Sequence, residues 1–129
     1  MEIIRNAHAG MPTQLRTDTF TGLVYADPVL GADGVAVNGV FFAPGARTYW
    51  HSHASGQFLY VVAGSGLICT EGGRSQVLTA GDVVWSAPGE RHWHGGGPDT
   101  TLLHLAVSLG QTTWLQEVSD AEYGPGARR

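Results

Sequence analysis

The sequence contains no lysine, and all seven of its basic residues are arginines. Without a lysine amine, the chain cannot form a Schiff base, attach pyridoxal phosphate or supply the lysine of a phosphate-binding loop. It also has a single cysteine, Cys69, so no disulfide can form within the chain. These enzyme classes and a disulfide-stabilised scaffold are therefore excluded.

Charge is also scarce, at 14% of residues with a net charge of -4, and the arginines are scattered along the chain. A surface for nucleic acid needs clustered basic side chains that neutralise several phosphates. No apolar run approaches the ~20 residues of a membrane-spanning helix, and residues 1–6 lack the pattern of a secretory signal. We therefore expect a cytoplasmic protein with neither nucleic acid nor a membrane as its partner.

Glycine, by contrast, is abundant, with 19 glycines among 129 residues, and it separates short apolar runs. Such runs predict strands at residues 23–25, 35–42, 58–63, 67–70, 77–78, 83–85 and 101–107. Turns are expected between them, including Gly64-Ser65-Gly66 and Gly95-Gly96-Gly97. Short strands with glycine-rich turns favour an all-β sandwich or barrel, here one domain over residues 1–129 with its core at about 21–110. Ser119 and Glu122 have capping-box spacing and predict a short helical turn near the C-terminus.

Five of the six histidines lie between residues 51 and 104, and four of them form the pairs His51-Ser-His53 and His92-Trp-His94. Alternate side chains of a strand point the same way, so each pair can present two imidazoles to one point. Such pairs are also found as surface or core histidines without a ligand. His104, within an apolar strand at 102–106, needs a polar partner and favours a metal site. His8 has no companion and is expected to be solvated.

The segment from Gly45 through His51, His53 and Gln57 resembles the first motif of the cupin family. Residues 81–92, which end in His92, resemble the second motif. In that motif the proline falls one residue late, at Pro88, and Gly96 stands where the family has asparagine. The resemblance covers residues 45–96 and implies an all-β cupin double-stranded β-helix (jelly-roll) barrel with a metal inside. It also implies that His51, His53 and His92 are metal ligands.

Gln57 stands where the cupin motif usually has a glutamate. The amide oxygen of Gln57 can be a weak metal ligand, or a water can take this ligand position. Alternatively, Gln57 has no role at the metal and is only the polar first residue of a strand. Without a carboxylate, the bound ion keeps more of its positive charge and is a stronger Lewis acid. The expected cofactor is one divalent ion, which can be Zn, Mn, Fe, Ni or Co, and polar chemistry is favoured over redox chemistry.

His94 and His104 match none of the three ligand histidines and are the expected proton-transfer residues. Either one could instead be a fourth ligand, and His94 could instead orient a neighbouring group. Alternation along the strands also predicts an apolar substrate pocket above the metal. Its expected lining residues are Asn38, Val40, Phe42, Leu59, Leu102 and Ala106. Arg47 could attract an acidic substrate or make a structural ion pair.

The sequence resembles a subgroup of small cupins that have Gly-Ala-Arg-Thr-x-Trp-His-x-His-x3-Gln, Gly-Asp-Val-Val-Trp and His-Trp-His-Gly. That subgroup resembles cupin hydroxynitrile lyases that depend on manganese, cupins associated with carboxymuconolactone decarboxylase, and metal-binding polyketide cyclases. The resemblance implies a metal-dependent lyase or cyclase acting on a small apolar or aromatic carbonyl compound. A cupin dioxygenase and a non-enzymatic ligand-binding cupin remain alternatives. A homodimer is the expected assembly.

Overall fold

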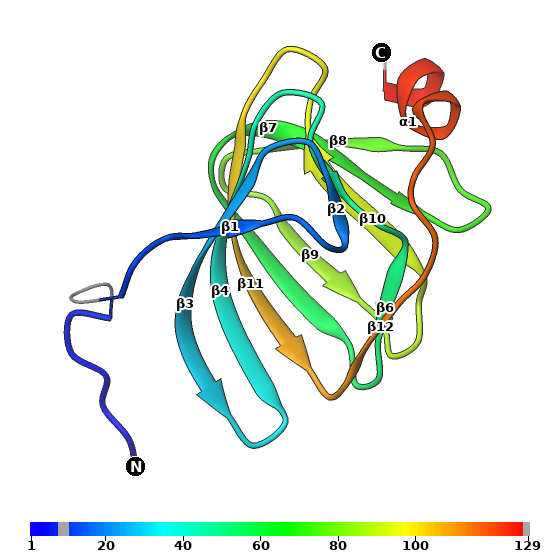
Figure 1. Ribbon diagram of the computed structural model, residues 1–129. Helices are drawn as coiled ribbons and strands as arrows, with labels where there is room; N and C mark the ends of the chain where they lie inside the picture. The colour runs from blue at the N-terminus through cyan, green and yellow to red at the C-terminus, as the bar shows by residue number, and fades with distance from the viewer. Residues whose placement is uncertain (8–10, 128–129) are drawn as a thin grey trace.

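The computed structural model describes residues 1–7 and 11–127, which form an antiparallel β-barrel with one short C-terminal helix (Figure 1). This confirms the predicted all-β class. His8 lies outside the described residues. The elements are β1 (Gln14–Arg16), β2 (Phe20–Thr21), β3 (Val24–Ala32), β4 (Val35–Phe42), β5 (Arg47–Thr48), β6 (His51–His53), β7 (Gln57–Thr70), β8 (Gln76–Thr79), β9 (Val83–Ser86), β10 (His92–Gly96), β11 (Leu102–Leu109), β12 (Thr112–Trp114) and α1 (Asp120–Ala127).

Two sheets make the barrel, and β7 belongs to both. The first sheet has the order β1-β3-β4-β11-β7-β9 and uses the first half of β7. The second sheet contains β2, β5, β6, β8, β10 and β12 and uses the second half of β7. One continuous strand therefore joins the two walls that enclose the interior.

The predicted turn at Gly64-Ser65-Gly66 was wrong, because the structure has one strand, β7, where two were expected. Gly64 has a φ of +80°, which bends the strand as it passes from the first sheet to the second. A Cβ at Gly66 would collide with the backbone of Gly95 on β10. These glycines serve a bend and a close strand contact, and Gly95 and Gly96 likewise lie within β10 rather than in a turn.

Two apolar clusters stabilise the barrel. The first lies between the sheets and contains the fully buried Val24, Phe42, Val61 and Leu102. The second contains Trp93 and Leu67 of the second sheet, covered by residues of the C-terminal segment such as Val118 and Tyr123. The C-terminal segment thus closes the outer side of the second sheet.

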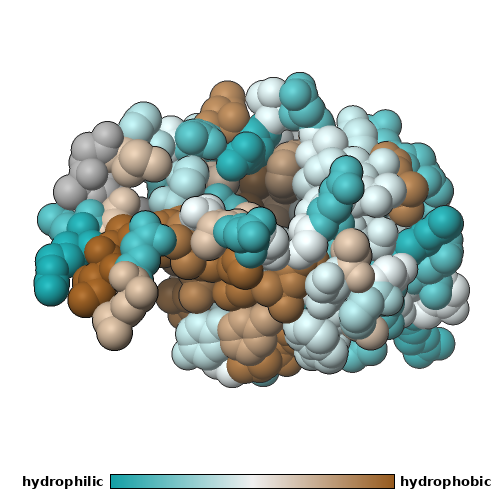
Figure 2. All heavy atoms as spheres, turned by 90° about the horizontal axis from the view of Figure 1, so that it is seen from below, coloured by the Kyte–Doolittle hydropathy of each residue, from teal (hydrophilic) through white to brown (hydrophobic). Residues whose placement is uncertain are grey.

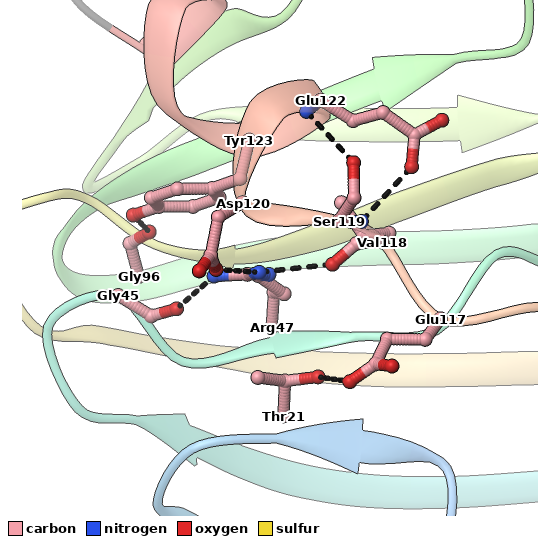
Figure 3. A network of polar contacts seen from close by, with 10 residues as sticks. All are labelled: Thr21, Gly45, Arg47, Gly96, Glu117, Val118, Ser119, Asp120, Glu122 and Tyr123. Carbon is pink, nitrogen blue, oxygen red and sulfur yellow. Dashed lines mark hydrogen bonds and ion pairs between the residues drawn. The ribbon is translucent and has the colours of Figure 1, made fainter.

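Arg47 fastens that segment to the barrel, as Figure 3 shows. Its guanidinium donates to the carbonyl oxygen of Val118 at 2.9 Å and to the Asp120 carboxylate at 2.8 Å. It also lies 4.6 Å from the centre of the Tyr123 ring, whose hydroxyl donates to the Gly96 carbonyl oxygen at 2.8 Å. Arg47 is 5% exposed and is therefore committed to the structural ion pair.

The predicted C-terminal helix is confirmed as α1, and its capping box is present. The Glu122 amide donates to the Ser119 hydroxyl at 3.0 Å, and the Ser119 amide donates to the Glu122 carboxylate at 2.9 Å. Among the described residues, no helix has the length and apolar character needed to cross a membrane.

Candidate metal centre and proton-transfer pair

The two His-x-His pairs lie on neighbouring antiparallel strands, β6 and β10, with His51 opposite His92 in the register. Alternation turns His51, His53 and His92 toward the barrel interior, where their exposed fractions are 1%, 3% and 0%. One ring nitrogen from each lies within 4.8 Å of the others. The structure thus brings together three imidazoles from segments about 40 positions apart in the sequence, in a cluster that is able to hold a metal ion.

Hydrogen bonds fix two of these rings in a ligand-ready orientation. The Nδ1 of His51 donates to the Tyr49 carbonyl oxygen at 2.8 Å, and that of His92 donates to the Glu90 carbonyl oxygen at 3.0 Å. Because a carbonyl only accepts, each neutral ring has its proton on Nδ1 and a free lone pair on Nε2. The Nδ1 of His53 lies 3.0 Å from the Thr112 hydroxyl, while its Nε2 is buried with no hydrogen-bond partner in the described part of the chain.

Gln57 adds an oxygen to this cluster. Its amide nitrogen donates to the Ser108 hydroxyl at 3.0 Å, which points the amide oxygen at Nε2 of His92, also at 3.0 Å. Two hydrogen-bond acceptors therefore face one another in a buried place, an arrangement that a cation stabilises. With the unpartnered Nε2 of His53, this donor set fits a divalent ion that accepts nitrogen and neutral oxygen ligands.

Burial keeps the three histidines neutral, which is the form that binds metal. Loss of hydration and, to a smaller extent, electrostatic repulsion from the neighbouring His92 ring lower the pKa of His53 to about 4. Burial, and after it electrostatic repulsion from His92, holds the pKa of His51 well below its ordinary value. Burial also lowers the pKa of His92. Near neutral pH the lone pairs are consequently available.

His94 and His104 form a second group beside the cluster. Nε2 of His104 lies 3.0 Å from Nδ1 of His94, so one ring donates to the other. Both rings are buried and pack against Phe42, with ring centres 5.8 and 5.3 Å away. Nε2 of His94 and Nδ1 of His104 have no hydrogen-bond partner among the described residues. Burial lowers the pKa of both rings, to about 4 for His104, so this pair is neutral near pH 7 and carries unprotonated ring nitrogens.

A cavity of about 480 Å³ borders both groups and is within the size range of small-molecule sites, although His92 itself is fully buried and is not among its lining residues. His51, His53, Gln57, His94 and His104 line it. Four of the expected pocket residues also line it, namely Asn38, Val40, Phe42 and Ala106. Leu59 and Leu102 have no exposed surface and are not among its lining residues.

Sequence reasoning missed several contributors to this cavity. Residues 15–20, which precede the expected core, form part of the wall, and β12 contributes Thr112 and Trp114. The Trp114 ring packs against the His51 ring in a tilted arrangement, with ring centres 4.7 Å apart. Strands of two or three residues carry too little alternation to be recognised, so these residues could be placed only by the strand pairing.

Residues 40–107 match the model of the cupin domain family. The chain belongs to the cupin family. A curated protein similar to this cupin is (R)-mandelonitrile lyase from Granulicella tundricola, which is 46% identical over 113 residues, covering 82% of this chain and 86% of the relative. His51, His53 and His92 form a cluster that is able to hold a metal ion. The resemblance to cupins predicted a metal ion at these three residues, and the family match agrees with that resemblance.

Solved structures agree on the fold. A cupin-like protein from Thermotoga maritima superposes with a TM-score of 0.83 at 38% identity, covering 88% of this chain and 91% of that one. The polyketide cyclase RemF from Streptomyces resistomycificus superposes with a TM-score of 0.74 at 20% identity, covering 92% and 87%. At 20% identity the second likeness establishes the shared barrel only.

Proposed function

We propose that this cupin is a metal-dependent lyase or cyclase that performs polar chemistry on a small carbonyl or hydroxyl compound. The observation that carries the proposal is the shared cavity, in which a buried metal-binding cluster and a separate histidine pair face the same space. The cluster suits the binding and polarising of an oxygen atom. The pair suits the movement of a proton to or from that atom.

His51, His53 and His92 would hold one divalent ion, with the amide oxygen of Gln57 beside them. When bound, the ion supplies a Lewis acid for a substrate oxygen. Every one of these four side chains is uncharged in its metal-binding form, so the ion's charge is not offset by a carboxylate. Ser108 holds Gln57, and the carbonyl oxygens of Tyr49 and Glu90 hold the two rings in place.

The His94–His104 pair would act as the base and acid. For a hydroxynitrile, the pair takes the hydroxyl proton at a free ring nitrogen while the bond between the carbinol and nitrile carbons breaks. The electron pair of that bond leaves with cyanide, and the carbon-oxygen bond becomes a carbonyl. Return of the proton to cyanide releases an aldehyde and hydrogen cyanide, so the reaction needs no oxidant. Val40, Phe42 and Ala106 provide an apolar wall for the rest of the substrate.

The name of the similar lyase from Granulicella tundricola suggests (R)-mandelonitrile as the first substrate to test. Purified protein loaded with each candidate divalent ion should release benzaldehyde without consuming oxygen. Oxygen consumption during turnover would instead support a dioxygenase. If the protein bound mandelonitrile or one of a panel of aldol substrates tightly but converted none of them, that result would support a ligand-binding cupin.

The His104→Phe variant tests the role of the pair. We expect the metal content to stay at the wild-type level while kcat falls by ~100-fold or more, the usual contribution of a general acid or base. Phe42→Leu is the matched control, because it alters packing against the same rings but removes no proton-carrying group. Loss of the metal from His104→Phe would make His104 a ligand and contradict this assignment.

The expected homodimer also remains a proposal.

A further inference from the structure

One basic side chain, that of Arg16 on β1, points toward the interior of the barrel. In the register of β1 with β3, Arg16 lies opposite Val24, which has no exposed surface and belongs to the first apolar cluster. Paired residues of neighbouring strands point to the same side of a sheet, so Arg16 faces inward from β1. Arg16 is half-buried and lines the cavity of about 480 Å³ that borders the histidines.

The guanidinium of Arg16 has no partner in the described part of the chain, where the ion pairs involve other arginines. Glu2 and Asp18 are the acidic residues that line the cavities around Arg16, and neither forms an ion pair with it. A half-buried guanidinium loses part of its hydration and of the freedom of its long side chain, a cost that an acceptor offsets. Such an acceptor is available only from outside this part of the chain.

Asn38 adds a second hydrogen-bond donor near Arg16. Both residues line the cavity of about 480 Å³ and also an adjoining one of about 400 Å³, which is formed by residues of the N-terminal segment and of β3. The Asn38 side chain makes no hydrogen bond to another described residue, so its amide is not committed elsewhere. A guanidinium and an amide together supply the donors that the two oxygens of a carboxylate accept.

The charges around the cavity favour a negatively charged ligand. Its lining histidines are neutral near pH 7, so Arg16 and Asp18 are the charged side chains among the described residues that line it. Asp18 is exposed, and solvent screens its charge, whereas Arg16 is half-buried. A divalent ion at the histidine cluster would add positive charge that no carboxylate of the cluster offsets.

The cavity also has an apolar part, where a ligand's uncharged body would lie. Val40, Phe42 and Ala106 line it alongside the polar groups. The face shown in Figure 2 is hollowed between hydrophilic residues, and apolar residues lie deeper in the hollow. Such a site suits a ligand that has an apolar body and one charged end.

We propose that Arg16, together with the amide of Asn38, binds a carboxylate of the substrate while the reacting oxygen lies at the histidine cluster. The substrate is then an anionic carbonyl or hydroxyl compound in which an apolar body separates the carboxylate from the reacting carbon. A guanidinium forms two parallel hydrogen bonds with a carboxylate, a pairing that an ammonium group does not reproduce. The inference rests on the proposed function for the position of the reacting oxygen, but carboxylate binding itself needs no turnover.

Calorimetric binding to metal-free, chelated protein tests the carboxylate site without any reaction. We expect the wild type to bind 4-formylbenzoate at least ~10-fold more tightly than its methyl ester, which has a similar body but no charge. Arg16→Met should remove this preference, and Arg16→Lys, which keeps the charge but not the paired hydrogen bonds, should retain part of it. Arg74→Met removes an exposed arginine that does not line this cavity, so it is the matched control and should keep the full preference.

Turnover of mandelonitrile and of its 4-carboxy derivative by metal-loaded protein provides a second measurement. Arg16→Met should lower the ratio of kcat/KM for the charged substrate to that for the neutral one by at least ~10-fold, through KM rather than kcat. An inward charge on an edge strand such as β1 can also protect that edge from pairing with another chain, but this structural role would affect both substrates alike.

Equal dissociation constants of the wild type for the acid and the ester would overturn the inference, and so would a kcat/KM ratio that Arg16→Met leaves unchanged. If mandelonitrile and its derivative are not converted but the binding preference still depends on Arg16, the proposed reaction fails and the carboxylate site stands.

Discussion

Gln57 points a neutral oxygen at His92, and a change to glutamate alters its charge with almost no change in size. We expect Gln57→Glu to bind a divalent ion more tightly, because an anion replaces a dipole beside a cation. Non-oxidative turnover should fall by about tenfold or more, because the carboxylate offsets the charge that polarises the substrate. The Ser108 hydroxyl can turn from acceptor to donor, so the local contact survives.

Metal dissociation, mandelonitrile turnover and oxygen uptake should be measured together in this variant. Gln76→Glu, which adds the same charge at an exposed position on β8, is the control for net charge. Tighter metal with unchanged or faster non-oxidative turnover would contradict the Lewis-acid proposal. Faster reaction with oxygen would favour a redox mechanism.

The buried histidines also set the pH dependence of stability in the metal-free protein. Burial lowers the pKa of His104 to about 4 in the folded chain, whereas an exposed histidine of the unfolded chain titrates near 6.5. Between these values the unfolded state binds more protons, so the free energy of unfolding rises with pH. The stabilisation is complete above about pH 6.5 and is lost as the pH falls toward 4.

Urea titrations of chelated protein between pH 4 and 8 test this dependence. His104→Phe removes one titrating group, so its stability should fall less steeply over the same range. A wild-type stability that is flat between pH 4 and 6.5, or a variant as steep as the wild type, would contradict the neutral burial of His104.

Among the elements, α1 and the segment before it depend on one buried side chain, Arg47. We expect Arg47→Met to lower the free energy of unfolding by about 1–3 kcal/mol, because it leaves the Val118 carbonyl oxygen without its donor. Arg91→Met is the matched control, because the Arg91–Glu71 pair has a 3.4 Å contact and both side chains are more than half exposed. Denaturant titration and limited proteolysis near residue 118 provide the readouts.

The Asp120 carboxylate is fully exposed, so Asp120→Asn should change stability much less than Arg47→Met does. An equal loss in the two variants would show that the ion pair, rather than the hydrogen bond to the backbone, holds the helix. An Arg47→Met variant as stable as the wild type would refute the proposed role of Arg47 in holding the C-terminal segment on the barrel.

The sequence predicted the elements unevenly, for physical reasons. The strand over 35–42 was predicted with its observed bounds because its turns and apolar run are both distinct. β7 was divided in two because Gly64 and Gly66 are typical of a turn, whereas here they permit a bend and a close contact. β1, β2, β5 and β12 are too short for a periodic signal.

The candidate site was more accessible to sequence reasoning than the elements were. Strand alternation predicted that His51 and His53, like His92 and His94, share a face, and the family resemblance predicted which of them form the metal cluster. In the structure His94 instead pairs with His104, a contact between β10 and β11 that depends on the pairing of both strands with β7. Periodicity within one strand carries no such information, and it also did not reveal the carbonyl partners of His51 and His92.

At the scale of the whole molecule, metal binding should be coupled to folding. The cluster joins β6 to β10, so an ion bound there stabilises the folded state and not the unfolded chain. At a free metal concentration a thousand times the dissociation constant, the free energy of unfolding should rise by about 4 kcal/mol. Elemental analysis should find about one ion per folded chain.

The variant that combines His51→Ala and His92→Ala should neither retain metal nor be stabilised by it, whereas His104→Phe should still show the metal-dependent rise in Tm. Calorimetry with and without a chelator provides the comparison. Stoichiometric metal in the double variant would refute the assigned cluster.

The position of β7 also affects how the protein is synthesised. β7 pairs with β8, β9, β10 and β11, and all four follow it in the chain. At about 5–20 residues per second, a nascent chain would hold the uncharged run from Phe58 to Val62 without any strand partner for seconds. Such a run is typical of segments that aggregate when they are left unpaired. Ribosome pausing between β7 and β11 would therefore lower the yield of folded protein, and a chaperone that binds extended apolar segments would restore it.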